Sequence, residues 1–203
     1  MGLLLNKKKN RKKIQDEQKS PEIEKKEIKI TRNSIKLALL GESGVGKSSI
    51  CTSILGYDLE NYNDIIKSGK VEKKQLLNNG KEIRLIIWDT VGQERFRSVA
   101  IKTANYVDGI IIVFDVIYRR SFDNLEGWFP EIKENCYKDP IIILFANKVD
   151  VEEDKREVSR EEIENFMKAK NLVYFEISAK NRTGIDDDIS YIANKIYNKM
   201  MGN

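Results

Sequence analysis

The sequence predicts an α/β fold, in which helices cover both faces of a mostly parallel six-stranded sheet that contains one antiparallel strand. Apolar runs alternate with helical stretches from Ser34 onward. Several of these runs are continuous and β-branched, as in strands that are buried on both faces. Such alternation favours parallel strands joined by helices, and a single hairpin signal adds the antiparallel strand. The 203 residues suit one folded domain, 34–203, preceded by a tail, 1–33.

The elements follow in order along the chain. The expected strands are "IKLALL" (35–40), "VEKKQLL" (71–77), "IRLIIWD" (83–89), "GIIIVFDV" (109–116), "IIILFAN" (141–147) and "LVYFEIS" (172–178). The second and third flank "NNG" (78–80), a two-residue hairpin signal in which Asn and Gly accept positive φ. Helices are expected from near Lys47 and over 94–105, 121–136, 159–170 and 186–200, with Ser159 and Glu162 as a capping box. Ligands of such sheets bind beyond the carboxyl ends of the strands.

Composition excludes several classes of function. The chain has no histidine, which excludes histidine bases and zinc sites built on imidazole. Cys51 and Cys136 lie far apart in no metal or redox pattern and suggest a reducing compartment. The apolar runs are too short to cross a bilayer. We therefore expect a cytoplasmic protein, or one that lies peripherally on a membrane surface.

Positive charge is concentrated at the N-terminus. Residues 1–32 carry eleven Lys or Arg and five Asp or Glu, a net charge of 11 − 5 = +6, whereas the whole chain is +4. The rest of the chain is thus near −2, which argues against a folded domain that binds nucleic acid. The repetitive Lys, Glu and Asn composition of the tail predicts disorder, with a frayed helix around 13–29.

"GESGVGKS" (41–48) is typical of a phosphate-binding loop. It matches G-x-x-x-x-G-K-[ST] between a strand and a helix, which is the context that this motif requires. Its glycines let backbone N–H groups approach phosphate oxygens, while Lys47 reaches the β- and γ-phosphates and the Ser48 hydroxyl ligates Mg²⁺. The predicted nucleotide contacts here are Ser43, Gly44, Val45, Gly46, Lys47, Ser48 and Ser49. The alternative is a glycine-rich turn with no ligand.

"LIIWDTVGQE" (85–94) predicts the metal and the catalytic residue. Asp89 ends a buried strand, where a carboxylate is costly unless it faces a cation, so we expect it to hold Mg²⁺ through water. The N–H of Gly92 would approach the γ-phosphate, and Gln93 is the candidate catalytic residue that orients the attacking water. Alternatively, Asp89 caps the turn that follows it.

"ANKVD" (146–150) and "ISAK" (177–180) predict recognition of guanine. Asp150 can accept two N–H groups from the guanine edge, which adenine cannot offer. Asn147 would fix the loop and the ring, and the stem of Lys148 would cover the base. From the second motif, Ser178, Ala179 and Lys180 are expected at the base, with the Ala179 N–H directed at the guanine oxygen. An N-K-x-D string alone could also be an ordinary polar turn.

Together these segments resemble small GTPases of the Ras superfamily, most closely the Rab branch. The resemblance rests on "GESGVGKSS", "WDTVGQERFRS", "GIIIVFDV", "SFDNLEGW", "NKVD" and "ISAKN", and spans about residues 34–200. It implies a P-loop NTPase G domain that binds GTP or GDP with Mg²⁺, hydrolyses GTP slowly and switches between two states. It further implies an exchange factor, an activating protein and effectors, and a role in vesicle traffic at the cytosolic face of endomembranes.

The sequence departs from the Rab pattern in its switch regions. An ungapped count places Ile66 where the family has a threonine that ligates Mg²⁺, and the nearest following hydroxyl is Ser68. Of three aromatic effector positions only Trp88 is kept; the others fall at Val71 and Thr103. Val91 replaces an alanine. These changes leave open an alternative function, a scaffold stabilised by guanine nucleotide that neither switches nor hydrolyses it effectively.

The membrane anchor also departs from the family. "YNKMMGN" at the end of the sequence has no cysteine for a prenyl group. Met1-Gly2 resembles a myristoylation start, although Asn6 occupies the position that prefers Ser or Thr. "KKKNRKK" follows, and one acyl chain plus a basic patch can anchor a protein to a membrane. The alternative is a solvated disordered tail, or a basic run like those of nuclear-import signals.

Overall fold

The computed structural model describes residues 33–57, 69–89, 101 and 104–202. These residues belong to one compact unit, Arg32–Asn203. The expected tail 1–33 lies almost wholly outside the described residues, so its disorder and its boundary stay predictions. Of the helix expected over 94–105, only Ile101, Ala104 and Asn105 are described.

The described strands and helices follow the predicted order. The strands are β1 (Ser34–Leu40), β2 (Lys70–Leu76), β3 (Glu82–Asp89), β4 (Gly109–Asp115), β5 (Ile141–Asn147) and β6 (Val173–Ile177). The helices are α1 (Lys47–Leu55), α4 (Arg119–Asp123), α5 (Trp128–Asn135), α6 (Arg160–Lys170) and α7 (Ile185–Met201), with short 3₁₀ helices η2 (Asn124–Gly127) and η3 (Glu153–Lys155).

The sheet has the order β2-β3-β1-β4-β5-β6. β2 pairs antiparallel with β3, and the other four pairings are parallel. The predicted fold class, with its one antiparallel strand, is therefore confirmed. Because β1, β3, β4, β5 and β6 run in the same direction, their carboxyl ends meet at one edge of the sheet, and every sequence motif that carries chemistry begins there.

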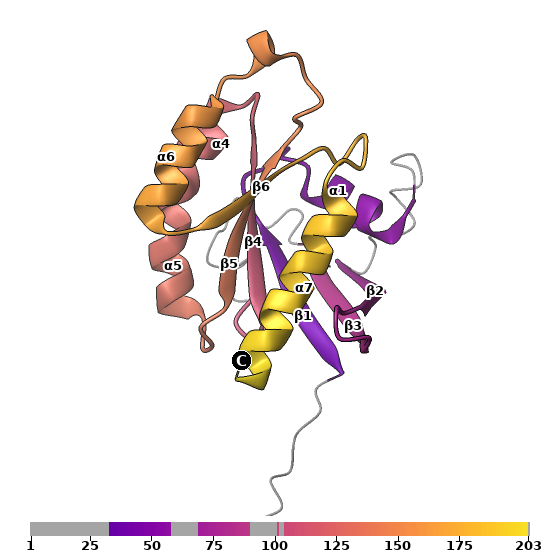
Figure 1. The fold of residues 1–203 in the computed structure, drawn as a ribbon. Coiled ribbons are helices and arrows are strands. Elements are labelled where there is room, and N and C mark those ends of the chain that lie inside the picture. Colours follow the sequence, from indigo (N-terminus) through magenta and orange to yellow (C-terminus); the bar gives the residue numbers. More distant parts are fainter. Residues whose placement is uncertain (1–32, 58–68, 90–100, 102–103, 203) are drawn as a thin grey trace, which may run out of the picture. The chain divides into compact units, whose positions relative to one another are not determined.

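Two hydrophobic cores lie on opposite faces of the sheet. α1 and α7 cover one face and α4, α5 and α6 cover the other (Figure 1). The central strand β4 supplies both cores, because alternate side chains of a strand point to opposite faces. Ile111 and Val113 pack beneath α1 and α7, whereas Ile112 and Phe114 pack beneath α4–α6. All seven residues of β4 are buried, which accounts for its unbroken apolar sequence.

The β2–β3 turn differs from the two-residue turn that the sequence predicts. The Gly80 N–H donates to the Leu77 carbonyl at 2.9 Å, and the Leu77 N–H donates to the Lys81 carbonyl at 2.9 Å. The turn therefore contains three residues, and only Gly80 among them adopts a positive φ, of 79°. A type I turn followed by a left-handed glycine has this form and keeps the twist of the strands. Asn79 does not need positive φ here; its Oδ1 accepts the Lys81 N–H at 3.0 Å.

The helix expected over 121–136 is divided into α4, η2 and α5. Pro130 lies in the first turn of α5, where a missing N–H is tolerated. A continuous α-helix would place the proline ring against the carbonyl of residue 126, so the chain passes through 3₁₀ geometry first. The capping box of α6 is confirmed: Ser159 accepts the Glu162 N–H at 3.3 Å, and Glu162 accepts the Ser159 N–H at 3.1 Å.

Candidate nucleotide-binding site

The loop between β1 and α1 forms an open cradle with a positive character. Lys47 begins α1, is only 5% exposed, and donates its ammonium to the carbonyls of Gly41 at 3.0 Å and Glu42 at 2.8 Å. The Lys47 side chain thus folds back over the loop, and these bonds hold its positive charge there. The first turn of α1 carries no acidic residue, and no side chain caps its N-terminus. The N–H groups of the first turn and the helix dipole therefore favour an anion at this end.

Asn147 at the end of β5 ties the phosphate loop to the end of β6. Its Nδ2 donates to the Val45 carbonyl at 2.8 Å, and its Oδ1 accepts the Ala179 N–H at 3.1 Å. The side chain is 1% exposed. Gly46 must lack a side chain, because a Cβ there would overlap the Asn147 amide nitrogen, and its φ of 99° is left-handed. Two motifs that are a hundred residues apart thus meet through one amide.

The Ala179 N–H has a partner that the sequence did not suggest. It was predicted to meet a guanine oxygen, but in this structure it donates to Asn147. A guanine oxygen would have to share this N–H with the Asn147 amide or replace the amide. Its role toward the base stays a prediction.

Asp150 is held by the second base motif. Its Oδ1 accepts the Ser178 hydroxyl at 2.7 Å, and the Lys180 ammonium lies 3.9 Å from its Oδ2. Ser178 in turn accepts the Asn181 N–H at 3.0 Å, which fixes the hydroxyl. The carboxylate is therefore preoriented and keeps acceptor capacity for N–H groups of a ligand.

These residues line a cleft of about 330 Å³. Its walls are formed by Gly46, Ser49, Ile117, Asn147, Lys148, Asp150, Val151, Ala179 and Lys180. Its size and mixed lining suit a flat heteroaromatic ring. Sequence reasoning missed the two apolar walls, Ile117 and Val151. The sequence could have indicated both residues, because Ile117 directly follows "GIIIVFDV" and Val151 directly follows "ANKVD". Residues just after neighbouring parallel strands lie near one another, at the edge where the carboxyl ends of the strands meet.

Asp115 is a third residue that the sequence analysis missed. It ends β4, is buried, and its Oδ2 lies 2.5 Å from the Lys148 ammonium. Lys148 also donates to the Gly44 carbonyl at 3.0 Å. Its backbone is left-handed, with φ of 70°, which costs about 1 kcal/mol for a residue with a side chain. The ion pair and the bond to Gly44 offset that cost and hold the lysine at the cleft; that its stem covers a base stays a prediction.

The predicted magnesium ligands lie on neighbouring elements. Ser48 is in the first turn of α1, and the buried Asp89 ends β3. Cys51, one turn after Ser48, has its thiol pKa raised by burial and secondarily by the negative charge of Asp89. The carboxylate thus acts on the helix face that carries Ser48. A hydroxyl and a carboxylate beside a phosphate loop are oxygen ligands of the kind that Mg²⁺ takes, so the residues fit this ion.

The other predicted contacts lie outside the described residues. These are Gly92, Gln93, Val91, Ile66, Ser68 and Thr103. Of the effector positions, Trp88 is half-buried and the Lys70 ammonium lies 5.7 Å from its ring centre. Val71 is buried opposite Ile87 and belongs to the core beneath α1 and α7. Position 71 therefore offers an effector neither an aromatic ring nor an exposed side chain.

Comparison with known proteins agrees with this geometry. Residues 36–198 match the Ras family. A probable Rab-related GTPase of Acanthamoeba polyphaga mimivirus is 35% identical over 173 residues, covering 85% of this chain and 79% of the relative. Ras-related protein Rab-13 of Rattus norvegicus is 36% identical over 172 residues, and that of Bos taurus is 34% identical over 170, each covering 82% of both chains.

These relatives favour a GTPase over the nucleotide-stabilised scaffold that the switch I departure left open. They match over most of their own length, and the matched range includes the phosphate loop and both base motifs. The chain therefore belongs to the Ras family, as a Rab-like member of the Ras superfamily of small GTPases.

Proposed function

We propose that this protein binds GTP and GDP with Mg²⁺, hydrolyses GTP slowly, and acts as a GTP/GDP switch in intracellular vesicle traffic. One observation carries the nucleotide assignment: the Asp150 carboxylate, fixed by Ser178, forms part of a cleft that also contains Asn147 and Lys148. Guanine presents two N–H groups on one edge, and adenine does not. A carboxylate in this cleft selects guanine, because an adenine would leave it desolvated without a donor.

Each part of the nucleotide meets different residues of the chain. The loop N–H groups and Lys47 bind the phosphates, and Ser48 and Asp89 would hold Mg²⁺. When bound, this ion would supply positive charge that stabilises the negative charge of the phosphates. Gln93 orients the attacking water. Without an arginine from a partner, hydrolysis is expected on the order of 10⁻⁴ to 10⁻² s⁻¹.

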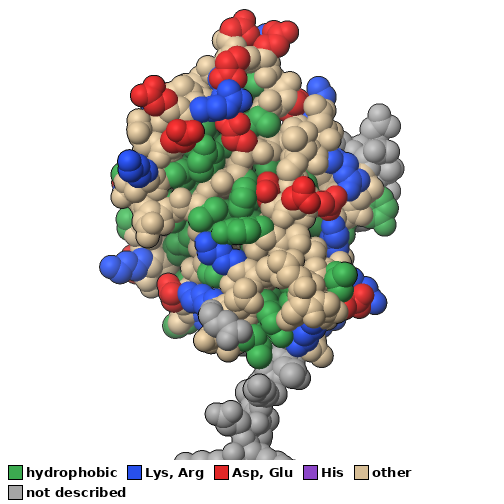
Figure 2. Space-filling view, in the orientation of Figure 1, with side chains coloured by type: hydrophobic (Ala, Val, Ile, Leu, Met, Phe, Trp, Pro, Cys, Tyr) green, Lys and Arg blue, Asp and Glu red, His purple; other side chains and the backbone are tan. Residues whose placement is uncertain are grey.

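Three kinds of partner protein are expected from the slow hydrolysis of GTP and from the family. Because intrinsic hydrolysis is slow, an activating protein is needed to end the signal, and an exchange factor to renew it. Effectors would read the GTP-bound state. Figure 2 shows basic and acidic side chains interspersed over the face drawn, a pattern that does not favour nucleic acid there.

Attachment to a membrane is proposed through the N-terminal tail. Among the described residues, no helix is long and apolar enough to cross a bilayer. Gly2 followed by "KKKNRKK" offers an acylation site next to a basic segment. Mass spectrometry of the native protein tests this. A myristoylated Gly2 supports anchoring at the cytosolic face of endomembranes, and an unmodified Gly2 would leave electrostatic attraction alone.

Competition binding tests the nucleotide assignment. A fluorescent GDP bound to the purified protein with Mg²⁺ is displaced by unlabelled GTP, GDP or ATP. We expect GTP and GDP to displace it at similar concentrations and ATP only at far higher ones. Asp150→Ala should lose affinity for both guanine nucleotides. Equal displacement by ATP and GTP would refute the proposed function.

A further inference from the structure

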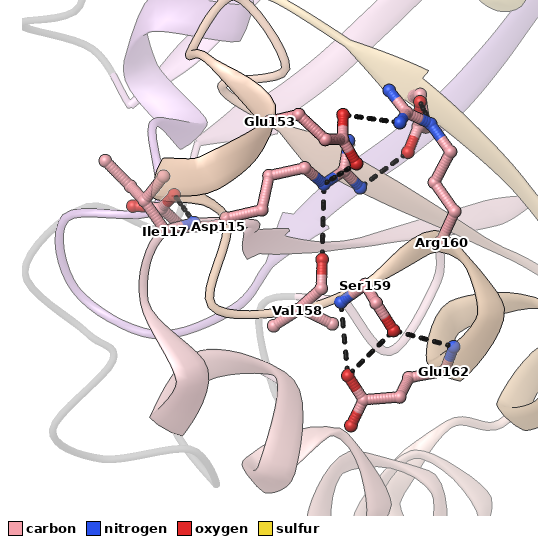
Figure 3. A network of polar contacts seen from close by, with 9 residues as sticks. Asp115, Ile117, Glu153, Val158, Ser159, Arg160 and Glu162 are labelled. Carbon is pink, nitrogen blue, oxygen red and sulfur yellow. Dashed lines mark hydrogen bonds and ion pairs between the residues drawn. The ribbon is translucent and has the colours of Figure 1, made fainter.

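The chain segment that follows Asp150 is anchored by a buried arginine. Arg156 comes directly after η3, and its side chain is 3% exposed. Its Nη2 donates to Glu176 Oε1 at 2.7 Å, and its Nε donates to the Val158 carbonyl at 3.2 Å. Figure 3 shows this cluster, with Glu153 and Arg160 on one side and the Val158 carbonyl on the other. Glu153 Oε1 lies farther off, 3.9 Å from Nε, and the buried Nη1 has no hydrogen bond within the described structure, so the bonds to Glu176 and Val158 are the hydrogen bonds that hold this cation.

Glu176 lies on the strand that leads into the second base motif. It pairs with Ala146 across the β5–β6 ladder and precedes Ser178 by two residues. Ser178 binds Asp150, and Asp150 precedes Arg156 by six residues. The chain and these two contacts therefore form a closed ring. Opening the ring at the Arg156–Glu176 pair removes one of its two side-chain links. The Ser178 hydroxyl, the Lys180 ammonium at 3.9 Å and the Val149 N–H bond to the Ile177 carbonyl at 3.3 Å remain between this loop and the end of β6.

The two arginines that bind Glu176 differ in burial. Arg160 donates to the other carboxylate oxygen, Oε2, at 3.2 Å, but its side chain is 50% exposed. Glu176 itself is 24% exposed. Water screens the Arg160 contact, whereas the Arg156 guanidinium has little water to replace its carboxylate. Of the two arginine contacts, the Arg156 contact thus contributes more to fixing the segment, beside the bonds from the Glu157 and Val158 N–H groups to the Val116 carbonyl at 2.9 and 3.2 Å. Arg160 is its matched exposed counterpart.

We infer that Arg156 and Glu176 are positioning residues for guanine recognition, because the ion pair of the buried Arg156 with Glu176 helps to hold Asp150 and the Val151 wall against the end of β6. This inference rests on the proposed binding of guanine nucleotide. Neither residue lines the cleft. They act through Asp150, so their loss weakens the contact with the guanine amino group more than the contacts with phosphate.

Dissociation of fluorescent GDP and IDP from the full-length protein tests the inference. IDP lacks the amino group that Asp150 accepts but keeps the phosphates. Arg156→Met should raise the GDP dissociation rate roughly tenfold, as for a lost charge-assisted hydrogen bond. The IDP rate should rise much less, so that the ratio of the two rates approaches one. Arg160→Met should change both rates by less than about twofold, as for an exposed pair.

A purely structural role gives a different result. If Arg156→Met raises both rates by the same factor, or if Arg160→Met has the same effect, the inference is overturned. Should Arg156→Met fail to fold, Arg156→Lys decides the matter, because a lysine reaches Glu176 or the Val158 carbonyl but not both. It should lower the GDP preference partway, and an unchanged preference contradicts the inference. If wild-type protein fails to prefer GDP over ADP, the proposed function itself is wrong.

Discussion

Asn147→Ala should be among the most destabilising single substitutions near the site. The change removes both hydrogen bonds of a side chain that is buried, and it leaves the Val45 carbonyl and the Ala179 N–H without partners. Val45 and Ala179 are themselves buried. Water cannot readily replace the lost amide, so each orphaned group costs about 1–3 kcal/mol. The free energy of unfolding should therefore fall by about 2–6 kcal/mol in total.

Urea unfolding of the GDP-bound protein, followed by circular dichroism, measures this loss. GDP stabilises the folded state according to its affinity, so the affinity of each variant must be measured separately and its contribution subtracted. Asn194→Ala is the matched control. Asn194 also makes two hydrogen bonds, to the Asn78 N–H at 2.9 Å and the Ser190 carbonyl at 2.8 Å, but neither partner is buried.

The control should lose less than about 1 kcal/mol, because water can hydrate the exposed partners and alanine favours the helix. A difference between the two variants that lies within experimental error would refute the reasoning. It would mean that the amide of Asn147 does not bridge buried groups in solution.

Five further outcomes are expected. Ser159→Ala should cost about 1 kcal/mol in urea unfolding, as for other N-caps. Hydrogen bonds from Arg119, and then from the Ser159 cap, lower the pKa of Glu162 from 4.5 to about 2. The carboxylate therefore stabilises the folded state fully above pH 4.5, and this contribution is lost as the pH falls toward 2. Glu162→Gln should remove this part of the pH dependence of the free energy of unfolding. Asp150→Asn should shift preference from GTP to XTP in competition binding, since an amide donor matches the xanthine oxygen; unchanged preference contradicts the assignment. Gln93→Leu should slow single-turnover hydrolysis without weakening GTP affinity, and an unchanged rate would mean that Gln93 is not catalytic. Hydrogen exchange over 58–72 should differ little between GDP and a GTP analogue, because Ile66 offers Mg²⁺ no hydroxyl; strong protection with the analogue alone would show that another group has replaced the threonine.

The sequence alone determined the fold class and the kinds of residue at the site. β-branched apolar runs such as "GIIIVFD" form buried strands because each residue of the run packs on one face or the other. The phosphate loop, Asp89, "NKVD" and "ISAK" are each local in sequence and lie at the end of a strand or directly after it. In a parallel sheet those positions converge at one edge, so their grouping follows from the topology without any knowledge of distances.

The tertiary structure decided how these residues hold one another. The bond from Asn147 to Val45 spans 102 positions, and the Asp115–Lys148 and Arg156–Glu176 pairs span 33 and 20. Such contacts depend on strand register and on the path of each loop, and neither is encoded in a local pattern of residue types. Backbone geometry also decided two local features: the three-residue turn that ends at Gly80, and the division of the helix expected over 121–136 before Pro130. The sequence therefore determined which groups gather at the edge of the sheet. Only packing in three dimensions decided which polar group each of these side chains binds, because a buried polar group must form a hydrogen bond with a partner that the fold brings within reach.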